Sequence, residues 1–274
     1  MLGTTYIDES EDEVTHKVFV ASGFIVHGTE SNDFRREWKK CLKRTGLKDY
    51  FKNSECMAVD GRFDFLRHKY RDIEAARQAA LKIRSQFDAI IQESNMTVMA
   101  AAMPIRLFKE FDSKPEVQRN PHWVRNYMVA TIQVAIGMVL DEMRMLTEQH
   151  NPEYPPIMSF ICDKSSLSKY VSEAYDALPI KYPTFKPYMG ELLNLDDTRQ
   201  PLLQAADLMA AICREMCMAG MDDEGRLLKP RVAGSIYKIK ACTREALEEA
   251  LKGNPPWVSK DEIKKRRQDR RRTV

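Results

Sequence analysis

The first strand that the sequence predicts runs directly into two acidic side chains. In "TTYIDES", residues 4–10, the first four residues favour a strand, whereas Asp8 and Glu9 do not. A carboxylate beside a buried strand is costly unless a partner offsets its charge. The acids therefore mark either a turn or a charged site. Because strand side chains alternate between faces, we expect only Asp8, which shares a face with Tyr6, to point inward.

A later strand also ends in an acid. "IMSFICD", residues 157–163, has the composition of a buried strand and ends at Asp163. Open α/β sheets place their functional sites at such strand ends. Asp163 also precedes a helix predicted over residues 166–178, and an acid near a helix N-terminus is stabilising. Both interpretations stay open from the sequence.

The third acid lies in an apolar helix. "LLQAADLMAAIC", residues 202–213, has only two polar residues, Gln204 and Asp207, and their spacing puts them on one helical face. The alanines around them would let this helix approach a sheet closely. A buried Asp207 needs a partner, which could be Arg214, Gln204 or a bound cation.

Taken together, the three acids favour a metal site. Converging carboxylates repel one another unless a divalent cation lies between them. Oxygen ligands alone suit Mg²⁺ or Mn²⁺, and a pair of such ions promotes phosphodiester hydrolysis by activating water and stabilising the leaving oxygen. We therefore expect Asp8, Asp163 and Asp207 to bind metal, with Gln204 orienting Asp207 or a bound water.

The remaining pattern predicts an α/β protein. Strands are predicted over residues 3–8, 17–26, 96–103, 157–163 and 184–193. Helices are predicted over residues 31–44, within 64–93, and over 121–149, 166–178 and 201–218. The polar turn between the first two strands allows them to pair as an antiparallel hairpin. Strands early in the chain, followed by strands that alternate with helices, imply a mixed sheet with helices packed on it.

Three short motifs resemble the domain of unknown function 3800 family: "YIDES" at 6–10, "ICD" at 161–163 and "QAAD" at 204–207. Members of that family typically open with Tyr-Ile-Asp-Glu-Ser-Gly and carry a late Gln-x-Ala-Asp. The similarity covers about residues 3–215, and Glu11 stands where the family has Gly. It implies a ribonuclease H-like fold and a metal-dependent nuclease. We therefore expect a ribonuclease H-like domain over residues 1–220, followed by a helical C-terminal extension of that domain over 221–258 and a basic tail over 259–274.

Matched by position, the resemblance gives Asp8, Asp163 and Asp207 as the metal-binding catalytic acids. The family also tends to have a polar motif with Glu or His between its first two helices. Here "NSECM" offers Glu55, either as a further catalytic acid or as a surface acid. Glu9 is a second candidate to complete the set.

Positive charge gathers at the C-terminus. Residues 260–272, "KDEIKKRRQDRRR", contain eight Lys or Arg and three Asp or Glu, whereas the rest of the chain has 35 basic and 37 acidic residues. Such a run is typical of an arm that binds nucleic acid, and also of a solvated helix end. We expect nucleic acid as the partner. Whether it is DNA or RNA stays open, as does the oligomeric state.

Other function classes find little support. The sequence contains no GxxxxGK phosphate loop, and Ser10 stands where an aspartate-based phosphotransferase needs a second Asp. The five histidines lie in no recognisable nucleophile motif. The alternative that remains is a non-catalytic nucleic-acid-binding or regulatory protein on the same fold.

The cysteines and the apolar runs bear on location. None of the six cysteines forms a CxxC pair, which favours free thiols in a reducing compartment. The N-terminus shows no basic region followed by an apolar one, and no apolar run reaches the roughly 18 residues that span a bilayer. We therefore expect a cytoplasmic protein that is not embedded in a membrane.

Overall fold

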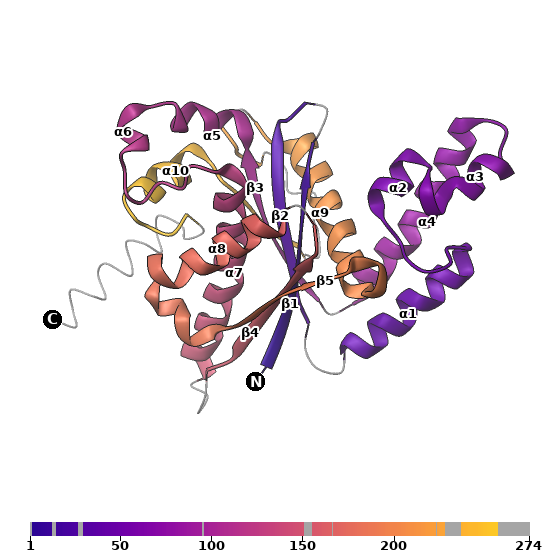
Figure 1. Cartoon of the computed structure of the whole chain (residues 1–274), viewed down its shortest axis with the longest axis horizontal. Coiled ribbons are helices and arrows are strands. Elements are labelled where there is room, and N and C mark those ends of the chain that lie inside the picture. The colour runs from indigo at the N-terminus through magenta and orange to yellow at the C-terminus, as the bar shows by residue number, and fades with distance from the viewer. Residues whose placement is uncertain are drawn as a thin grey trace.

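A six-stranded sheet forms the centre of the structure (Figure 1). The computed structural model describes residues 2–12, 15–26, 30–94, 96–150, 155–165, 167–222, 224–227 and 237–256. The strands are β1 (Leu2–Glu11), β2 (Val18–Val26), β3 (Thr97–Pro104), β4 (Ile157–Asp163), β5 (Met189–Leu195) and β6 (Tyr237–Ala241). They lie side by side in the order β5-β4-β1-β2-β3-β6.

The sheet is mixed. β1, β2 and β3 form an antiparallel meander, as the predicted hairpin requires. β4 and β5 continue the sheet parallel to β1, and β6 lies parallel to β3 at the opposite edge. Parallel neighbours need long crossovers, and helices precede both β4 and β5 along the chain. The architecture is the predicted α/β one and is consistent with a ribonuclease H-like fold.

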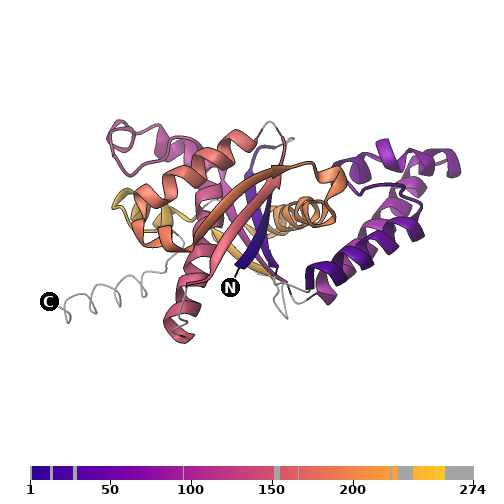
Figure 2. The same ribbon diagram turned by 60° about the horizontal axis from the view of Figure 1, so that its bottom comes forward.

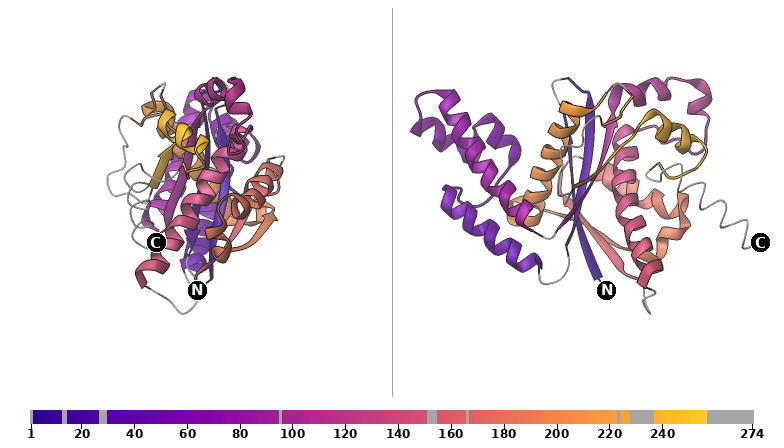
Figure 3. Two further views of the ribbon diagram at one scale, coloured as in Figure 1. Left: turned by 90° about the vertical axis from the view of Figure 1, so that its left-hand side faces the viewer. Right: turned by 180° about the vertical axis from the view of Figure 1, so that it is seen from behind.

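Helices cover both faces of the sheet, which Figure 3 shows nearly edge-on between them. α9 (Pro201–Gly220) crosses β1 and β2 on one face. On the other face α7 (Tyr127–His150) crosses β2 and β3, with α8 (Ser168–Lys181) beside it. The side chains of β1 alternate between the two cores on either side of the sheet: Tyr6 packs under α9, and Ile7 packs under α7. Four alanines of α9 are buried, as expected for a close approach to the sheet: Ala205, Ala206, Ala210 and Ala211.

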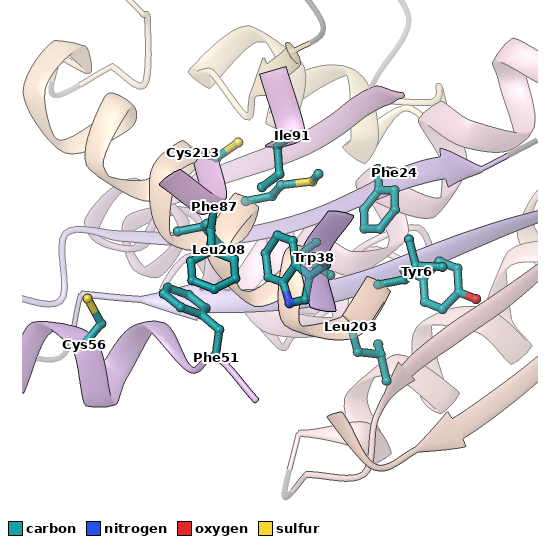
Figure 4. Close-up of a cluster of buried hydrophobic side chains, with 14 of the residues drawn as sticks. Tyr6, Phe24, Trp38, Phe51, Cys56, Phe87, Ile91, Leu203, Leu208 and Cys213 are labelled. Atoms are coloured by element: carbon teal, nitrogen blue, oxygen red, sulfur yellow. The ribbon is translucent and has the colours of Figure 1, made fainter. Parts of the chain in front are cut away.

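Between β2 and β3 the chain leaves the sheet and forms a helical insertion, residues 30–94, that projects to one side next to α9 (Figure 2). Its helices are α1 (Glu30–Thr45), α2 (Asn53–Ala58), α3 (Asp64–Lys69) and α4 (Ile73–Glu93). Trp38 and Phe51 pack on Phe87, with ring centroids 4.6 and 4.7 Å apart, and this aromatic group lies against Leu208 of α9 (Figure 4). The insertion is therefore part of the core under α9.

Three element boundaries differ clearly from the sequence prediction. The strand expected over residues 184–193 is β5, Met189–Leu195, and the 3-10 helix η2 (Pro183–Tyr188) precedes it. β1 does not end at Asp8 but continues to Glu11, because β2 stays paired with it as far as the pair Glu11 and Phe19. The long helix expected to begin at Pro121 begins at Tyr127, where the side chain of Asn126 accepts hydrogen bonds from the first backbone N–H groups.

Three further helices lie on the side of the sheet that α7 covers (Figure 1): α5 (Ile105–Asp112), α6 (Pro115–Gln118) and α10 (Arg244–Leu251). The described part of residues 221–258, expected to be helical, contains strand β6 as well as α10. The predicted basic tail, residues 259–274, lies outside the described residues.

Two observations bear on location. All six cysteines are free and buried. Within the described ranges, no helix is both long enough and apolar enough to cross a membrane.

Candidate functional site

Asp8 and Asp163 lie on neighbouring strands at the same level of the sheet. β1 and β4 pair in parallel with Tyr6 opposite Ile161, so the same register puts Asp8 beside Asp163. Tyr6 and Ile161 both belong to the core under α9. Because strand residues two apart share a face, both carboxylates are directed toward α9.

Asp207 lies on α9, the helix that covers this face. Its Oδ2 accepts a hydrogen bond from the backbone N–H of Asn53, the first residue of α2, at 2.8 Å. Arg214, one of the partners considered from the sequence, instead donates to the backbone carbonyl of Glu11 at 2.9 Å. The insertion, and not a side chain of α9, therefore supplies the hydrogen bond to Asp207.

A backbone amide orients each of the three acids. The donor–acceptor distances are 2.8 Å from Glu9 N to Asp8 Oδ1, 3.3 Å from Asp197 N to Asp163 Oδ1, and 2.8 Å from Asn53 N to Asp207 Oδ2. Such bonds favour the ionised form of a carboxyl group.

Burial and mutual repulsion act against that ionised form. Burial raises the pKa of Asp8 well above its usual range, and the charges of Glu9, Asp207 and Asp163 raise it further. Burial likewise raises the pKa values of Asp163 and Asp207. The register of β1 and β4 and the position of α9 over β1 thus put the three acids that the sequence singled out in one region of the fold.

Glu9 joins them, although the sequence predicted that it would point away. Burial raises its pKa to about 7, and the charges of Asp163 and Asp207 contribute to the rise. Alternation along β1 directs Asp8 and Glu9 to opposite faces. The charges of Asp163 and Asp207 nevertheless raise the pKa of the Glu9 carboxyl group. We call Asp8, Glu9, Asp163 and Asp207 the carboxylate cluster.

Two charged residues that sequence reasoning missed lie beside this cluster. Lys52, just before α2, forms an ion pair with Asp197, with 2.9 Å between Nζ and Oδ2. Burial alone would lower the pKa of Lys52, but the hydrogen bond to Asp197 and the charges of Asp207 and Asp163 raise it above its usual value. The 3-10 helix η3 (Asp197–Arg199) begins two residues after β5 ends. Because the sequence prediction ended that strand at residue 193, the strand-end rule that selected Asp163 did not reach Asp197.

Gln204 contacts the cluster indirectly. Its Oε1 accepts hydrogen bonds from Trp38 Nε1 at 2.8 Å and from the backbone N–H of Phe51 at 3.2 Å. Its Nε2 donates to the backbone carbonyl of Asp197 at 3.0 Å. Both ends of the amide are therefore engaged by the segments that carry Lys52 and Asp197. Gln204 acts on the cluster through this backbone and not through a direct bond to Asp207.

Glu55, suggested by the family resemblance, is engaged elsewhere. Its Oε1 accepts a hydrogen bond from the hydroxyl of Tyr50 at 2.8 Å, and its Oε2 accepts one from the backbone N–H of Arg62 at 2.7 Å. Gly61 has a positive φ of 50°, and a Cβ there would clash with the Glu55 carboxylate. These contacts give Glu55 a role in the turn between α2 and α3.

An unpaired hydroxyl lies next to Asp8. Ser22 of β2 is directly opposite Asp8 in the antiparallel pair, so the two side chains share a face about 5 Å apart at Cβ. Ser22 is completely buried, and its Oγ has no hydrogen-bond partner among the residues that the structure describes. A buried hydroxyl without a partner is unfavourable, which indicates that the chain alone does not satisfy this site.

The donor set suits a hard divalent cation, since it offers several carboxylate oxygens and the Ser22 hydroxyl behind Asp8. As they lie, no three His, Cys, Asp or Glu side chains in the described part of the chain are arranged to hold a metal ion. Cation binding therefore requires the carboxylates to turn toward the ion.

Comparisons with known proteins add no family assignment. No protein-family profile matches the chain, and a search of curated proteins finds no match either. The resemblance to the domain of unknown function 3800 family thus stays a prediction that rests on the motifs carrying Asp8, Asp163 and Asp207.

Proposed function

We propose that this protein is a nuclease that hydrolyses nucleic-acid phosphodiesters with Mg²⁺ or Mn²⁺ bound by Asp8, Asp163 and Asp207. The observation that carries the proposal is the carboxylate cluster, in which burial and neighbouring carboxylates raise the pKa of each acid. Like charges gathered in a partly buried site repel one another unless a cation offsets them. The cluster is therefore best explained by a ligand of positive charge.

Such cations supply the chemistry that phosphodiester hydrolysis needs. Held by Asp8, Asp163 and Asp207, they would lower the pKa of the attacking water and offset the charge that develops on the leaving oxygen. The protein's part is to orient the carboxylates, which the backbone amides of Asn53 and Asp197 do for Asp207 and Asp163. A reducing cytoplasm suits the proposal, because all six thiols are free.

A second candidate function is a non-catalytic nucleic-acid-binding or regulatory protein on the same fold. The observation that favours it is Lys52, whose ammonium group pairs with Asp197 and responds to the charges of Asp207 and Asp163. This cation belongs to the chain itself and offsets part of the negative charge without metal.

Cleavage assays separate the two functions. Purified protein is incubated with single-stranded and duplex DNA and RNA in Mg²⁺, in Mn²⁺ or in EDTA. We expect cleavage only with metal, and its loss in Asp8→Asn and in Asp207→Asn. Asp64→Asn serves as the control, since Asp64 is an exposed acid of α3 paired with His68. Metal-independent cleavage, or undiminished cleavage by Asp8→Asn, contradicts the proposal. Binding without cleavage by every form supports the second function.

A further inference from the structure

Helix α1 has a buried side and two flanks. Its buried side packs Phe34, Trp38 and Leu42 into the core under α9. One flank faces α4 across a groove, which is lined by Asp33, Glu37, Lys40 and Arg44 of α1 and by Gln86, Ala89, Ile90 and Glu93 of α4.

The opposite flank of α1 is basic. Arg35, Lys39 and Lys43 follow one another at intervals of four residues, which puts them about 6 Å apart along one side of the helix. Because successive residues of a helix are rotated by about 100°, the buried face of α1 separates these three residues from the residues that line the groove. We call these three residues the basic flank.

The basic flank begins against β1, the strand that carries Asp8. Nη2 of Arg35 donates a hydrogen bond to the hydroxyl of Tyr6 at 3.2 Å. Tyr6 lies two residues before Asp8 on the same face of β1. A row of positive charges therefore extends from Tyr6 outward along α1, with Lys39 and Lys43 exposed to solvent.

The cations of the basic flank lack acidic partners, whereas those on the groove side are engaged. Among the described side chains, no carboxylate lies within ion-pair distance of Arg35, Lys39 or Lys43. The Nε of Arg35 is buried and has no hydrogen-bond partner. By contrast, Lys40 pairs with Glu37 at 2.8 Å, and Arg44 donates to Gln86 at 3.1 Å. The flank thus presents positive charge that the protein does not itself neutralise.

We propose that the basic flank binds the backbone phosphates of the nucleic-acid strand that is cleaved at the carboxylate cluster. This inference rests on the proposed function. A row of unpaired cations at regular spacing matches a polymer that repeats its negative charge, whereas a small anion would engage only one of them. Arg35, nearest to Asp8, offers the planar donor group that suits a phosphate near the scissile bond. Lys39 and Lys43 then hold the phosphates that lead away from the site.

The test is a salt titration of binding in EDTA, where no metal-dependent cleavage can occur. Fluorescence anisotropy of labelled single-stranded and duplex oligonucleotides is measured for the wild type and two double variants. The test variant is Lys39→Gln with Lys43→Gln. The matched control is Lys40→Gln with Arg44→Gln, which removes the same charge from the groove side of the same helix. Thermal unfolding verifies that both variants are folded.

Two lost phosphate contacts should reduce the slope of log affinity against log salt by about 1.4 for a single strand or about 1.8 for a duplex. The control variant should keep a slope close to that of the wild type. Equal slopes and equal affinities for the two double variants would overturn the proposal. This experiment measures binding and not cleavage, so its outcome does not depend on the outcome of the nuclease assay.

Discussion

The Oε1 atom of Gln204 accepts a hydrogen bond from Nε1 of Trp38 at 2.8 Å, and both side chains are completely or almost completely buried. The same oxygen accepts the N–H of Phe51, and the amide nitrogen donates to the carbonyl of Asp197. Gln204 of α9 thereby connects three segments, which are α1, the residues just before α2, and η3. It positions both members of the ion pair between Lys52 and Asp197.

Replacing Gln204 with Leu should lower the free energy of unfolding by about 1–3 kcal/mol, because the indole N–H of Trp38 loses its acceptor in a buried site. Urea unfolding measures this change. Gln78→Leu is the control: Gln78 is exposed on α4 and bonds only to Glu74 in the same helix, so its effect should stay within about 0.5 kcal/mol. Equal stability losses in the two variants would mean that the buried amide has no special role.

Removing the hydroxyl of Ser22 should affect the protein differently with and without metal. Without metal, Ser22→Ala should be neutral or slightly stabilising, since the buried Oγ has no partner to lose. With Mn²⁺, a metal-bound Asp8 stays ionised and can accept a hydrogen bond from Ser22. We therefore expect Ser22→Ala to weaken Mn²⁺ binding about 10-fold, at the low end for groups that support a metal ligand.

Thr5→Val is the matched control for Ser22→Ala. The hydroxyl of Thr5 is also buried without a partner, but Thr5 shares the opposite face of β1 with Ile7. Without metal, the unfolding temperature of Thr5→Val should change as little as that of Ser22→Ala. In calorimetry, Thr5→Val should bind Mn²⁺ with the affinity of the wild type. If both variants bind Mn²⁺ as the wild type does, Ser22 does not support the site.

The metal-free protein should become less stable as pH rises through neutrality. Burial and the charges of Asp163 and Asp207 raise the pKa of Glu9 from 4.5 to about 7. Between these values the folded protein binds a proton that the unfolded chain has released, so stability falls with rising pH. The stability that the protonated Glu9 contributes is fully present below pH 4.5 and is lost as the pH rises through about 7.

Thermal unfolding in EDTA from about pH 5 to about pH 8 measures this dependence. Glu9→Gln, which cannot ionise, should show a shallower decline than the wild type. Identical profiles for the two proteins would show that the Glu9 carboxyl is not under the repulsion described above.

Hydrophobic pattern and strand-end acids predicted much of the fold and part of the site. The α/β class follows from the alternation of strands and helices, and Asp163 does end β4. The sequence did not show that β1 extends past Asp8, because that extension depends on pairing with Phe19, far along the hairpin. Propensity alone favours a turn at two consecutive acids, and the cross-strand hydrogen bonds override it.

Long-range contacts account for what the sequence left out. Lys52 approaches Asp197 because Gln204 holds the backbone on either side, and nothing in the local sequence around Lys52 indicates this. Glu55 fits the family motif by position. The hydrogen bonds from Tyr50 and Arg62 that engage it depend on the turn formed at Gly61.

The central claim is that Asp8, Asp163 and Asp207 bind a divalent cation together. The most direct measurement is anomalous scattering at the manganese absorption edge from crystals soaked in Mn²⁺, for the wild type and for Asp8→Asn. The account predicts a peak between the three carboxylates in the wild type, with Asp8 turned toward it, and a lost or much weaker peak in Asp8→Asn. No peak between these carboxylates in wild-type crystals, or an equal peak in both proteins, would contradict it.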